Sequence, residues 1–198
     1  MITTTFYDGQ GIGNQLWAWA TLRSIAKKRN YMYGIQAPWR FKGEDLFKID
    51  FGKKVFGVAP RNPSFSKPLG IRNYYREKMT LLEGVDVSGY DPLLVSIEDK
   101  TKIDGVFQCE DYIYESKDEI SEVLQLARPT ELRDSHCVVH IRGGDFKGSA
   151  RVSLKSKYFH DAMNFILDVD KSVTFIVCTN DTAHARKVLD NASVEIIS

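Results

Sequence analysis

One arginine stands where this sequence is best placed to bind an anion. The apolar residues 137–141 predict a buried strand, and Gly143 and Gly144 let the backbone turn sharply after it. Arg142 is then expected at the carboxyl end of a strand, where open α/β sheets bind their ligands. Its guanidinium carries a permanent charge and a planar fork of donors that suits phosphate oxygens. His140 and Asp145 flank it as candidate partners for a base, a ribose or the arginine itself.

The same residues also fit an ordinary strand, a Gly-Gly turn and a surface ion pair. Spacing alone does not separate the two interpretations, because short motifs recur by chance. The choice depends on whether other segments of the chain bring further ligand-binding groups.

A glycine-rich loop near the amino terminus is the second candidate for a binding site. Residues 2–7 predict a strand and residues 16–28 predict a helix that ends in basic residues. Gly9 and Gly11 suggest a dinucleotide-binding loop, but Asn14 stands where that motif needs a third glycine. The next predicted strand, residues 31–36, also lacks the terminal acidic residue that would hold a ribose. We therefore reject the dinucleotide motif, and Asn14 disfavours a nicotinamide-dependent oxidoreductase, a hypothesis that rests only on Gly9 and Gly11.

The loop is still suited to binding a ligand at the amino end of a helix. The candidate groups are the backbone at Gly11 and Gly13 and the side-chain amides of Asn14 and Gln15. The alternative role for Asn14 is to cap the helix, and one residue can serve both purposes.

Composition excludes several classes of protein. The chain has 198 residues, of which 43% are apolar and 27% are charged, so a packed core is expected. The net charge of +1 gives no support for a nucleic-acid-binding protein. No apolar run reaches the ~18–20 residues that cross a bilayer, and the amino terminus does not resemble a secretory signal. Three widely spaced cysteines are interpreted as reduced and structural, which favours a cytoplasmic location, and no Cys/His spacing indicates a metal site.

The middle of the chain gives weaker signals. Residues 55–59 and 93–97 are predicted as short strands, and the aromatic and basic residues 72–76 fit a packing edge better than an acceptor site. Ser116 and Glu119 have the spacing of a capping box before a helix that Pro129 would end. The polar residues 128–135 are the predicted linker.

After the linker, the pattern is strand, helix, strand, helix, strand. The strand at residues 173–178 is apolar throughout, so we expect both of its faces to be covered. Asn180 or Asp181 is expected to cap the helix that follows. This half is too small to complete a sheet covered on both faces. Three explanations stay open: a truncated chain, a natural minimal form, or a partner such as a second copy that completes the sheet.

Four segments in one order resemble the α1,2-fucosyltransferases. Residues 9–16 resemble the family's GGLGNQ opening, and residues 105–112 resemble its G-Y-F-Q-S-E-x-Y segment. Residues 139–146 resemble the motif H-x-R-R-G-D-Y, which the α1,6- and protein O-fucosyltransferases share. The fourth segment, residues 156–159 followed by 175–181, resembles the family's YY…A sequence followed by F-x-x-F-S-D-D. Each segment alone is weak, but four in register are fairly specific.

The resemblance implies a GT-B-like α/β fold, in which two Rossmann-like halves enclose a cleft. Residues 1–128 would form the acceptor-side half, and residues 129–198 would form an incomplete donor half that binds the nucleotide sugar. The implied reaction transfers L-fucose from GDP-fucose to a glycan hydroxyl with inversion and needs neither a cofactor nor a metal. Arg142 would bind the diphosphate and stabilise the leaving group, as the residues themselves also predict.

Other roles carried over from the family are more local. His140 and Asp181 would lie near the guanosine, with Asp145 and Asn180 in the same substrate-binding set, and Asn14 would reach the donor from the first half. The sequence departs from the family pattern at Gly143, where a second arginine is usual, at Asn180, where aspartate is common, and by lacking the family's third motif, which would lie beyond Ser198. Glycine at position 143 is consistent with a weaker phosphate contact or with a different donor. Together with the end of the sequence before the third motif, it motivates the alternative to an enzyme, a non-catalytic glycan- or nucleotide-binding module. The base that activates the acceptor is not assigned; Asp8, Glu110 and Asp111 are candidates by position.

Overall fold

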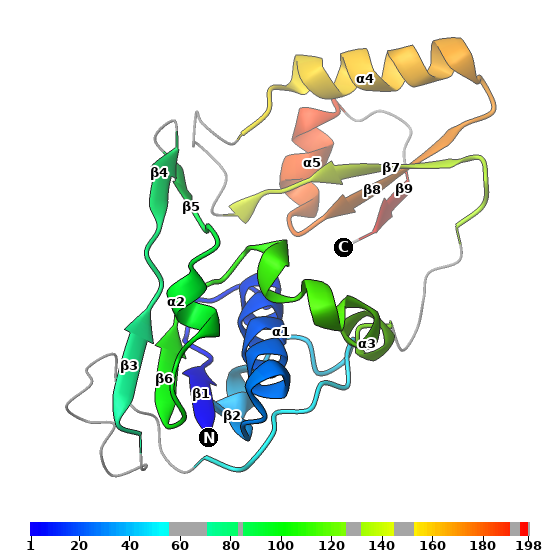
Figure 1. Cartoon of the computed structure of the whole chain (residues 1–198). Helices are drawn as coiled ribbons and strands as arrows, with labels where there is room; N and C mark the ends of the chain where they lie inside the picture. The colour runs from blue at the N-terminus through cyan, green and yellow to red at the C-terminus, as the bar shows by residue number, and fades with distance from the viewer. Residues whose placement is uncertain (56–70, 83–84, 126–131, 145–152, 191–194, 198) are drawn as a thin grey trace. The chain divides into compact units, whose positions relative to one another are not determined.

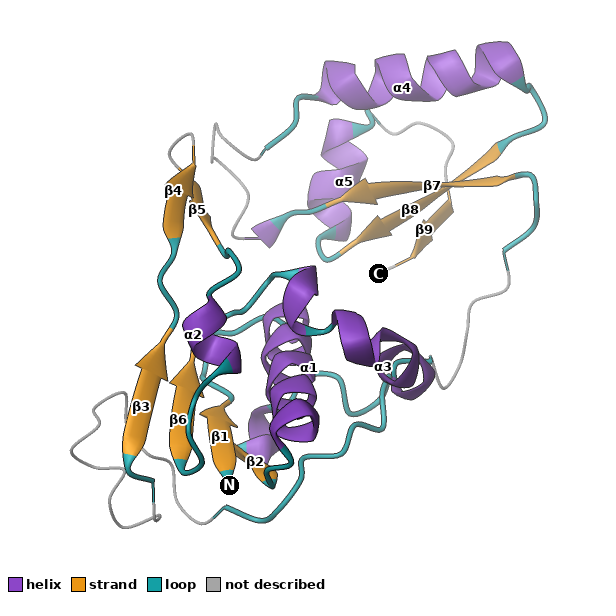
Figure 2. Ribbon diagram, in the orientation of Figure 1, coloured by secondary structure: helices purple, strands orange, loops and turns teal. Residues whose placement is uncertain are grey.

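The computed structural model describes residues 1–55, 71–82, 85–125, 132–144, 153–190 and 195–197. The chain forms two compact units, Met1–Pro129 and Thr130–Ser198 (Figure 1). Strands and helices alternate in both units (Figure 2), and the α/β class with parallel sheets is confirmed. The strand predicted at residues 55–59 lies mostly outside the described residues.

The first unit is built on a parallel four-stranded sheet with the order β2-β1-β6-β3. Its strands are β1 (Ile2–Thr5), β2 (Tyr33–Gln36), β3 (Asn73–Arg76) and β6 (Thr101–Asp104). All four run in the same direction, so their carboxyl ends meet at one edge. An antiparallel pair, β4 (Thr80–Leu82) and β5 (Val85–Val87), follows β3 in the chain.

Helix α1 (Ile12–Arg29) connects β1 to β2 and begins four residues before the predicted start. Gly11 is the N-cap residue and makes no side-chain cap, so the predicted capping role of Asn14 is wrong; Asn14 lies inside the first turn. The helix ends at Asn30, whose left-handed backbone (φ 53°) lets its N–H bond to the carbonyls of Ala26 and Lys27. The basic residues of its last turn face the negative end of the helix dipole.

One side of this sheet forms the main core. Ile2 and Ile103 from the strands pack with Trp19, Leu22 and Leu94 in one buried cluster. In contrast, Thr3, Thr5 and Lys102 are polar and fully or almost fully buried. Lys102 pairs with Thr3 in the sheet, and its ammonium lies 5.6 Å from the centre of the Tyr7 ring.

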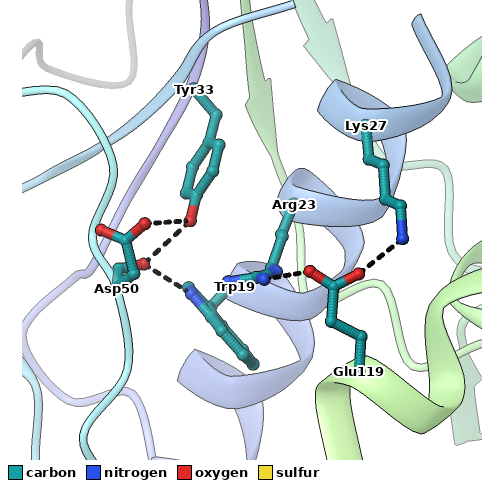
Figure 3. A network of polar contacts seen from close by, with 6 residues as sticks. All are labelled: Trp19, Arg23, Lys27, Tyr33, Asp50 and Glu119. Atoms are coloured by element: carbon teal, nitrogen blue, oxygen red, sulfur yellow. Dashed lines mark hydrogen bonds and ion pairs between the residues drawn. The ribbon is translucent and has the colours of Figure 1, made fainter. Parts of the chain in front are cut away.

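Helix α3 (Lys117–Val123) is held to α1 by charged groups (Figure 3). The Glu119 carboxylate accepts hydrogen bonds from Arg23 and, at 2.6 Å, from Lys27. Helix α1 also contacts Asp50, because the Trp19 indole donates to the Asp50 carbonyl at 2.8 Å. The Tyr33 hydroxyl of β2 bonds to the same residue. The predicted capping box is wrong, because Ser116 makes no cap and the Glu119 side chain is engaged by α1. Glu119 forms ion pairs with α1 instead of the local capping box with Ser116.

The strand predicted at residues 93–97 is also wrong. This segment contains helix α2 (Pro92–Val95), where Asp91 caps the first turn by accepting from the Leu93 N–H at 2.9 Å. Proline at the first helical position suits this start, since its missing N–H would have had no helical partner. The 3₁₀ turns η1 (Pro38–Arg40), η4 (Glu110–Tyr112) and η5 (Tyr114–Ser116) complete the regular structure described in this unit.

The second unit has a parallel sheet of β7 (His136–Ile141), β8 (Thr174–Thr179) and β9 (Glu195–Ile197) in that order. Helices α4 (Ser156–Val169) and α5 (Thr182–Val188) make the crossovers. Phe159, Ala185 and Leu189 pack against Ile141 and Val177. Because strand order follows chain order and parallel crossovers are right-handed as a rule, α4 and α5 are expected on the same face, and both contribute to this one buried cluster.

The opposite face of this sheet is less covered than the sequence predicted. Val138 is 50% exposed, and His140 and Cys178 are also exposed. β8 is covered on both faces at its centre, because Ile176 and Val177 point to opposite faces and are both buried, whereas its residues Thr174 and Cys178 are exposed. The prediction that β8 is covered on both faces is therefore confirmed only for the middle of the strand, and β7 is only partly buried. The physical reason is the topology, which places both helices on one side.

Candidate functional site

Arg142 lies directly after β7, at the carboxyl edge of the second unit's sheet, as the sequence predicted. Its side chain is exposed. A pocket of about 260 Å³ opens beside it. The pocket lining combines His140, Ile141, Arg142, Ser153, Leu154, Phe159 and His184. It therefore joins a permanent cation, two imidazoles and a hydroxyl to an apolar wall, which suits an anionic group attached to a flat or apolar one.

The turn after Arg142 is fixed by the end of β8. The Gly143 N–H donates to Asn180 Oδ1 at 2.8 Å, and Gly144 has a left-handed backbone with φ 61°. The Asp181 carboxylate accepts from the His184 N–H at 2.9 Å and so caps α5. Of the two residues predicted as the cap, Asp181 is the one that serves. Asn180 and Asp181 thus connect the Arg142 turn to the helix that contributes His184.

Gly143 is required here by close packing. The residue is buried, and a Cβ at this position would overlap the Asp181 side chain, 3.0 Å from its Cγ. A second arginine cannot occupy this position while Asp181 stays in place. The departure from the family pattern therefore has a local steric cause.

The ligand-binding roles predicted for His140, Asn180 and Asp181 stay predictions. His140 lines the Arg142 pocket, whereas Asn180 and Asp181 hold its turn. Asp145 lies outside the described residues.

In the first unit, two segments of the resemblance meet. Asn14 Oδ1 accepts a hydrogen bond from Gln108 Nε2 at 2.9 Å. Gly11 and Gly13 are exposed, with open space where a side chain would begin, so a ligand has room to approach the backbone. Their binding roles, and that of Asn14, stay predictions.

Gln15 is a correction. Its side chain is fully buried, its Nε2 donates to the Arg40 carbonyl at 2.7 Å, and its Oε1 accepts from the Lys42 N–H at 3.0 Å. The amide holds the segment around η1 against α1 and does not face a ligand. The prediction of a substrate-binding Gln15 is therefore wrong, because tertiary contacts use both ends of the amide.

The candidate bases occupy surface or turn positions. Asp8 is exposed and forms an ion pair with Arg40 at 2.8 Å. Glu110 and Asp111 lie in η4. None of these contacts identifies one of the three carboxylates as the base that activates the acceptor.

Sequence reasoning missed Glu77. It directly follows β3, just as Arg142 directly follows β7, and only 9% of it is exposed. Its Oε2 accepts from the N–H groups of Val106 and Phe107 at 2.7 and 3.0 Å. The signal available in the sequence was its position one residue past a short aromatic strand.

A family comparison adds the deciding observation. The model of glycosyl transferase family 11 matches residues 71–197, which is more than half of the chain. The chain belongs to glycosyl transferase family 11. The resemblance to the α1,2-fucosyltransferases is thereby confirmed.

The family 11 match spans Glu77, Gln108 and Arg142, and it begins after the glycine-rich loop. No curated protein sequence and no solved structure matches the chain significantly. Within the described ranges, no helix is long and apolar enough to cross a bilayer.

Proposed function

We propose that this family 11 chain transfers L-fucose from GDP-fucose to a hydroxyl of a glycan, with inversion at the anomeric carbon. The proposal rests on family membership together with one observation, the position of Arg142 in a pocket at the carboxyl edge of a parallel sheet. The two units would be the halves of a GT-B-like enzyme, with the donor bound by the second unit.

The proposed chemistry assigns Arg142 to the leaving group. The acceptor hydroxyl oxygen attacks the anomeric carbon of fucose and its proton is released to water, while the bond from that carbon to the phosphate oxygen breaks and GDP leaves with the electron pair. Negative charge therefore grows on the diphosphate, and a fixed guanidinium beside it stabilises the transition state more than the ground state. A cation in this position supplies part of what a divalent ion provides in metal-dependent enzymes, so we propose that no metal is needed.

The second unit supports this assignment with its other pocket residues. His140 and His184 are placed to donate to phosphate or base atoms, and Leu154 and Phe159 offer an apolar surface for a purine. The Gly143 turn is held by Asn180, so the guanidinium leaves the backbone from a fixed point. Because Gly143 has its own steric cause, its presence does not favour a non-catalytic module.

The test is calorimetric GDP binding to the wild-type chain and to Arg142→Ala, Arg142→Lys and Arg133→Ala. Loss of a charge-assisted phosphate contact of ~1.5–3 kcal/mol weakens GDP binding roughly 10- to 100-fold. Lysine keeps the charge without the bidentate fork, so its affinity should fall in between. Arg133 is exposed before the amino end of β7, roughly 20 Å away along the strand, and serves as the matched control.

Transfer of labelled fucose from GDP-fucose to a galactoside completes the test. The expected result is product with the wild-type chain and with Arg133→Ala, and strongly reduced product with Arg142→Ala. GDP binding that is absent in the wild type, or equal in Arg142→Ala, would overturn the proposal.

A further inference from the structure

The carboxyl edge of the first unit's sheet carries a second pocket, of about 270 Å³. Its lining comes from the ends of β1, β3 and β6 and the residues that follow: Tyr7, Gln10, Arg76, Glu77, Met79, Asp104, Gly105 and Val106. This is the edge at which parallel α/β sheets bind ligands. The residue types are carboxylates, an arginine, an amide and an aromatic ring, which together suit a small polar ligand.

The Glu77 carboxylate is the unusual feature of this pocket. Its side chain is more than nine-tenths buried, and its Oε2 is held by two backbone N–H groups. In the part of the chain that the structure describes, its Oε1 is buried and has no hydrogen-bond partner. An unpaired buried oxygen of this kind costs roughly 1–3 kcal/mol, and more when the group is charged, so a ligand that donates a hydrogen bond to it gains that energy back.

The backbone around Glu77 is built to hold it. Gly105 has no room for a side chain, because a Cβ there would lie 2.5 Å from Glu77 Cβ and from Oε2. Phe107 is fully buried in a left-handed conformation with φ 53°, which few residues other than glycine adopt. A strained backbone of this kind persists where the surrounding structure imposes it. In this conformation the N–H groups of Val106 and Phe107 both donate to Glu77 Oε2. The segment that resembles the family's second motif is therefore a cradle for Glu77.

The charges around the pocket favour a neutral ligand. The two negative charges of Glu77 and Asp104 are balanced by two positive charges nearby. These are Arg76, which lies opposite Asp104 in the register of β3 and β6, and the buried Lys102. The Tyr74 hydroxyl donates to Asp104 Oδ2 at 2.6 Å, so part of that carboxylate is already used. The two carboxylates would repel a phosphate, and the arginine would repel a cation. Hydroxyl groups both donate and accept, so a polyol can bond to Glu77 and to Arg76 at once.

We infer that this pocket binds the acceptor sugar, with one sugar hydroxyl donating to Glu77 Oε1. The inference rests on the proposed function for its choice of ligand, since a glycosyltransferase needs a site for a neutral hydroxylated acceptor. Met79 and the Tyr7 ring provide apolar surface of the kind that packs against the C–H face of a sugar. Glu77 and Arg76 are then acceptor-binding residues.

The experiment measures binding of methyl β-D-galactopyranoside by NMR titration, using the whole chain and the variant Glu77→Gln. Glutamine keeps an oxygen for the Val106 and Phe107 N–H groups and replaces the unpaired oxygen with a donor. We expect galactoside binding to weaken at least ~10-fold, while the melting temperature stays equal or rises because a buried charge is removed. Glu44→Gln, the same change at an exposed position, is the control and should alter neither quantity.

A second variant keeps the test valid if Glu77→Gln fails to fold. Arg76 is exposed, so Arg76→Gln should leave the fold intact and still weaken galactoside binding. Calorimetric GDP binding is measured on each variant and should not change. This inference is overturned if the wild-type chain does not bind the galactoside, or if binding is unchanged in both Glu77→Gln and Arg76→Gln. In either case, GDP binding by the wild-type chain would still support the proposed function. Loss of GDP binding in the wild type would instead remove the proposed function, and a Glu77-dependent galactoside site would remain.

Discussion

Asn14 and Gln108 are 94 residues apart in the chain, and their side-chain amides share a hydrogen bond of 2.9 Å. Asn14 lies in the first turn of α1, and Gln108 follows β6 and the cradle of Glu77. The bond uses Asn14 Oδ1, which leaves the Asn14 NH₂ group available as a donor. Two segments that are each weak signals in the sequence therefore belong to one surface of the first unit.

This relationship separates a binding role of Asn14 from a structural one. In Asn14→Asp, the oxygen that accepts from Gln108 is kept and the NH₂ donor is lost. A carboxylate in the first turn of a helix is favourable by ~0.3–1 kcal/mol, so stability should not fall. If Asn14 donates to the donor phosphates, fucosyl transfer should drop at least ~10-fold, since the new charge also repels them. Unfolding curves and transfer rates are the two measurements; an unchanged transfer rate would assign Asn14 to structure alone.

The contact between Gly143 and Asp181 predicts a steric effect on stability. Gly143→Ala places a methyl group against the Asp181 side chain, and such overpacking costs about 1–3 kcal/mol. The matched control is Gly13→Ala, at a helical position with open space, where alanine is expected to stabilise by up to ~1 kcal/mol. Chemical denaturation measures both. Equal stability of Gly143→Ala and wild type would contradict the described turn.

The contact between α1 and α3 predicts a pH dependence of stability. Hydrogen bonds from Lys27 and then Arg23 lower the pKa of Glu119 to about 2, from an ordinary value of 4.5. Since the folded pKa lies below the unfolded one, the stabilisation is present above pH 4.5 and is lost as the pH falls towards 2. The pair is partly exposed, so its contribution is about 1 kcal/mol or less.

The measurement is the unfolding free energy of wild type and Glu119→Gln between pH 7 and pH 2. The difference between the two proteins should be constant from pH 7 to about 5 and should close below pH 4.5. Glu122→Gln, an exposed change on the same helix, should show no such closure. A gap that persists at pH 2 would mean that Glu119 acts through packing instead of charge.

Local patterns in the sequence were sufficient for the parts of this protein that depend on neighbouring residues. The strand that ends before Arg142 follows from an apolar run and two glycines, and Asp181 caps α5 within three residues of its own position. In both cases the interacting groups are close in the chain, so composition and spacing carry the information. The α/β class follows from the same alternation of short apolar runs and amphipathic helices.

Tertiary structure decided what depends on distant partners. Gln15 looks like a ligand-binding amide until Arg40 and Lys42 are seen to use both of its ends, and Glu119 looks like a capping residue until α1 engages it. The position of Glu77 one residue past β3 does not reveal its hydrogen-bond partners, because its cradle is formed by Val106 and Phe107 about thirty residues later. A side chain's hydrogen bonds depend on which groups the fold brings within about 3 Å, and a linear pattern does not contain that distance.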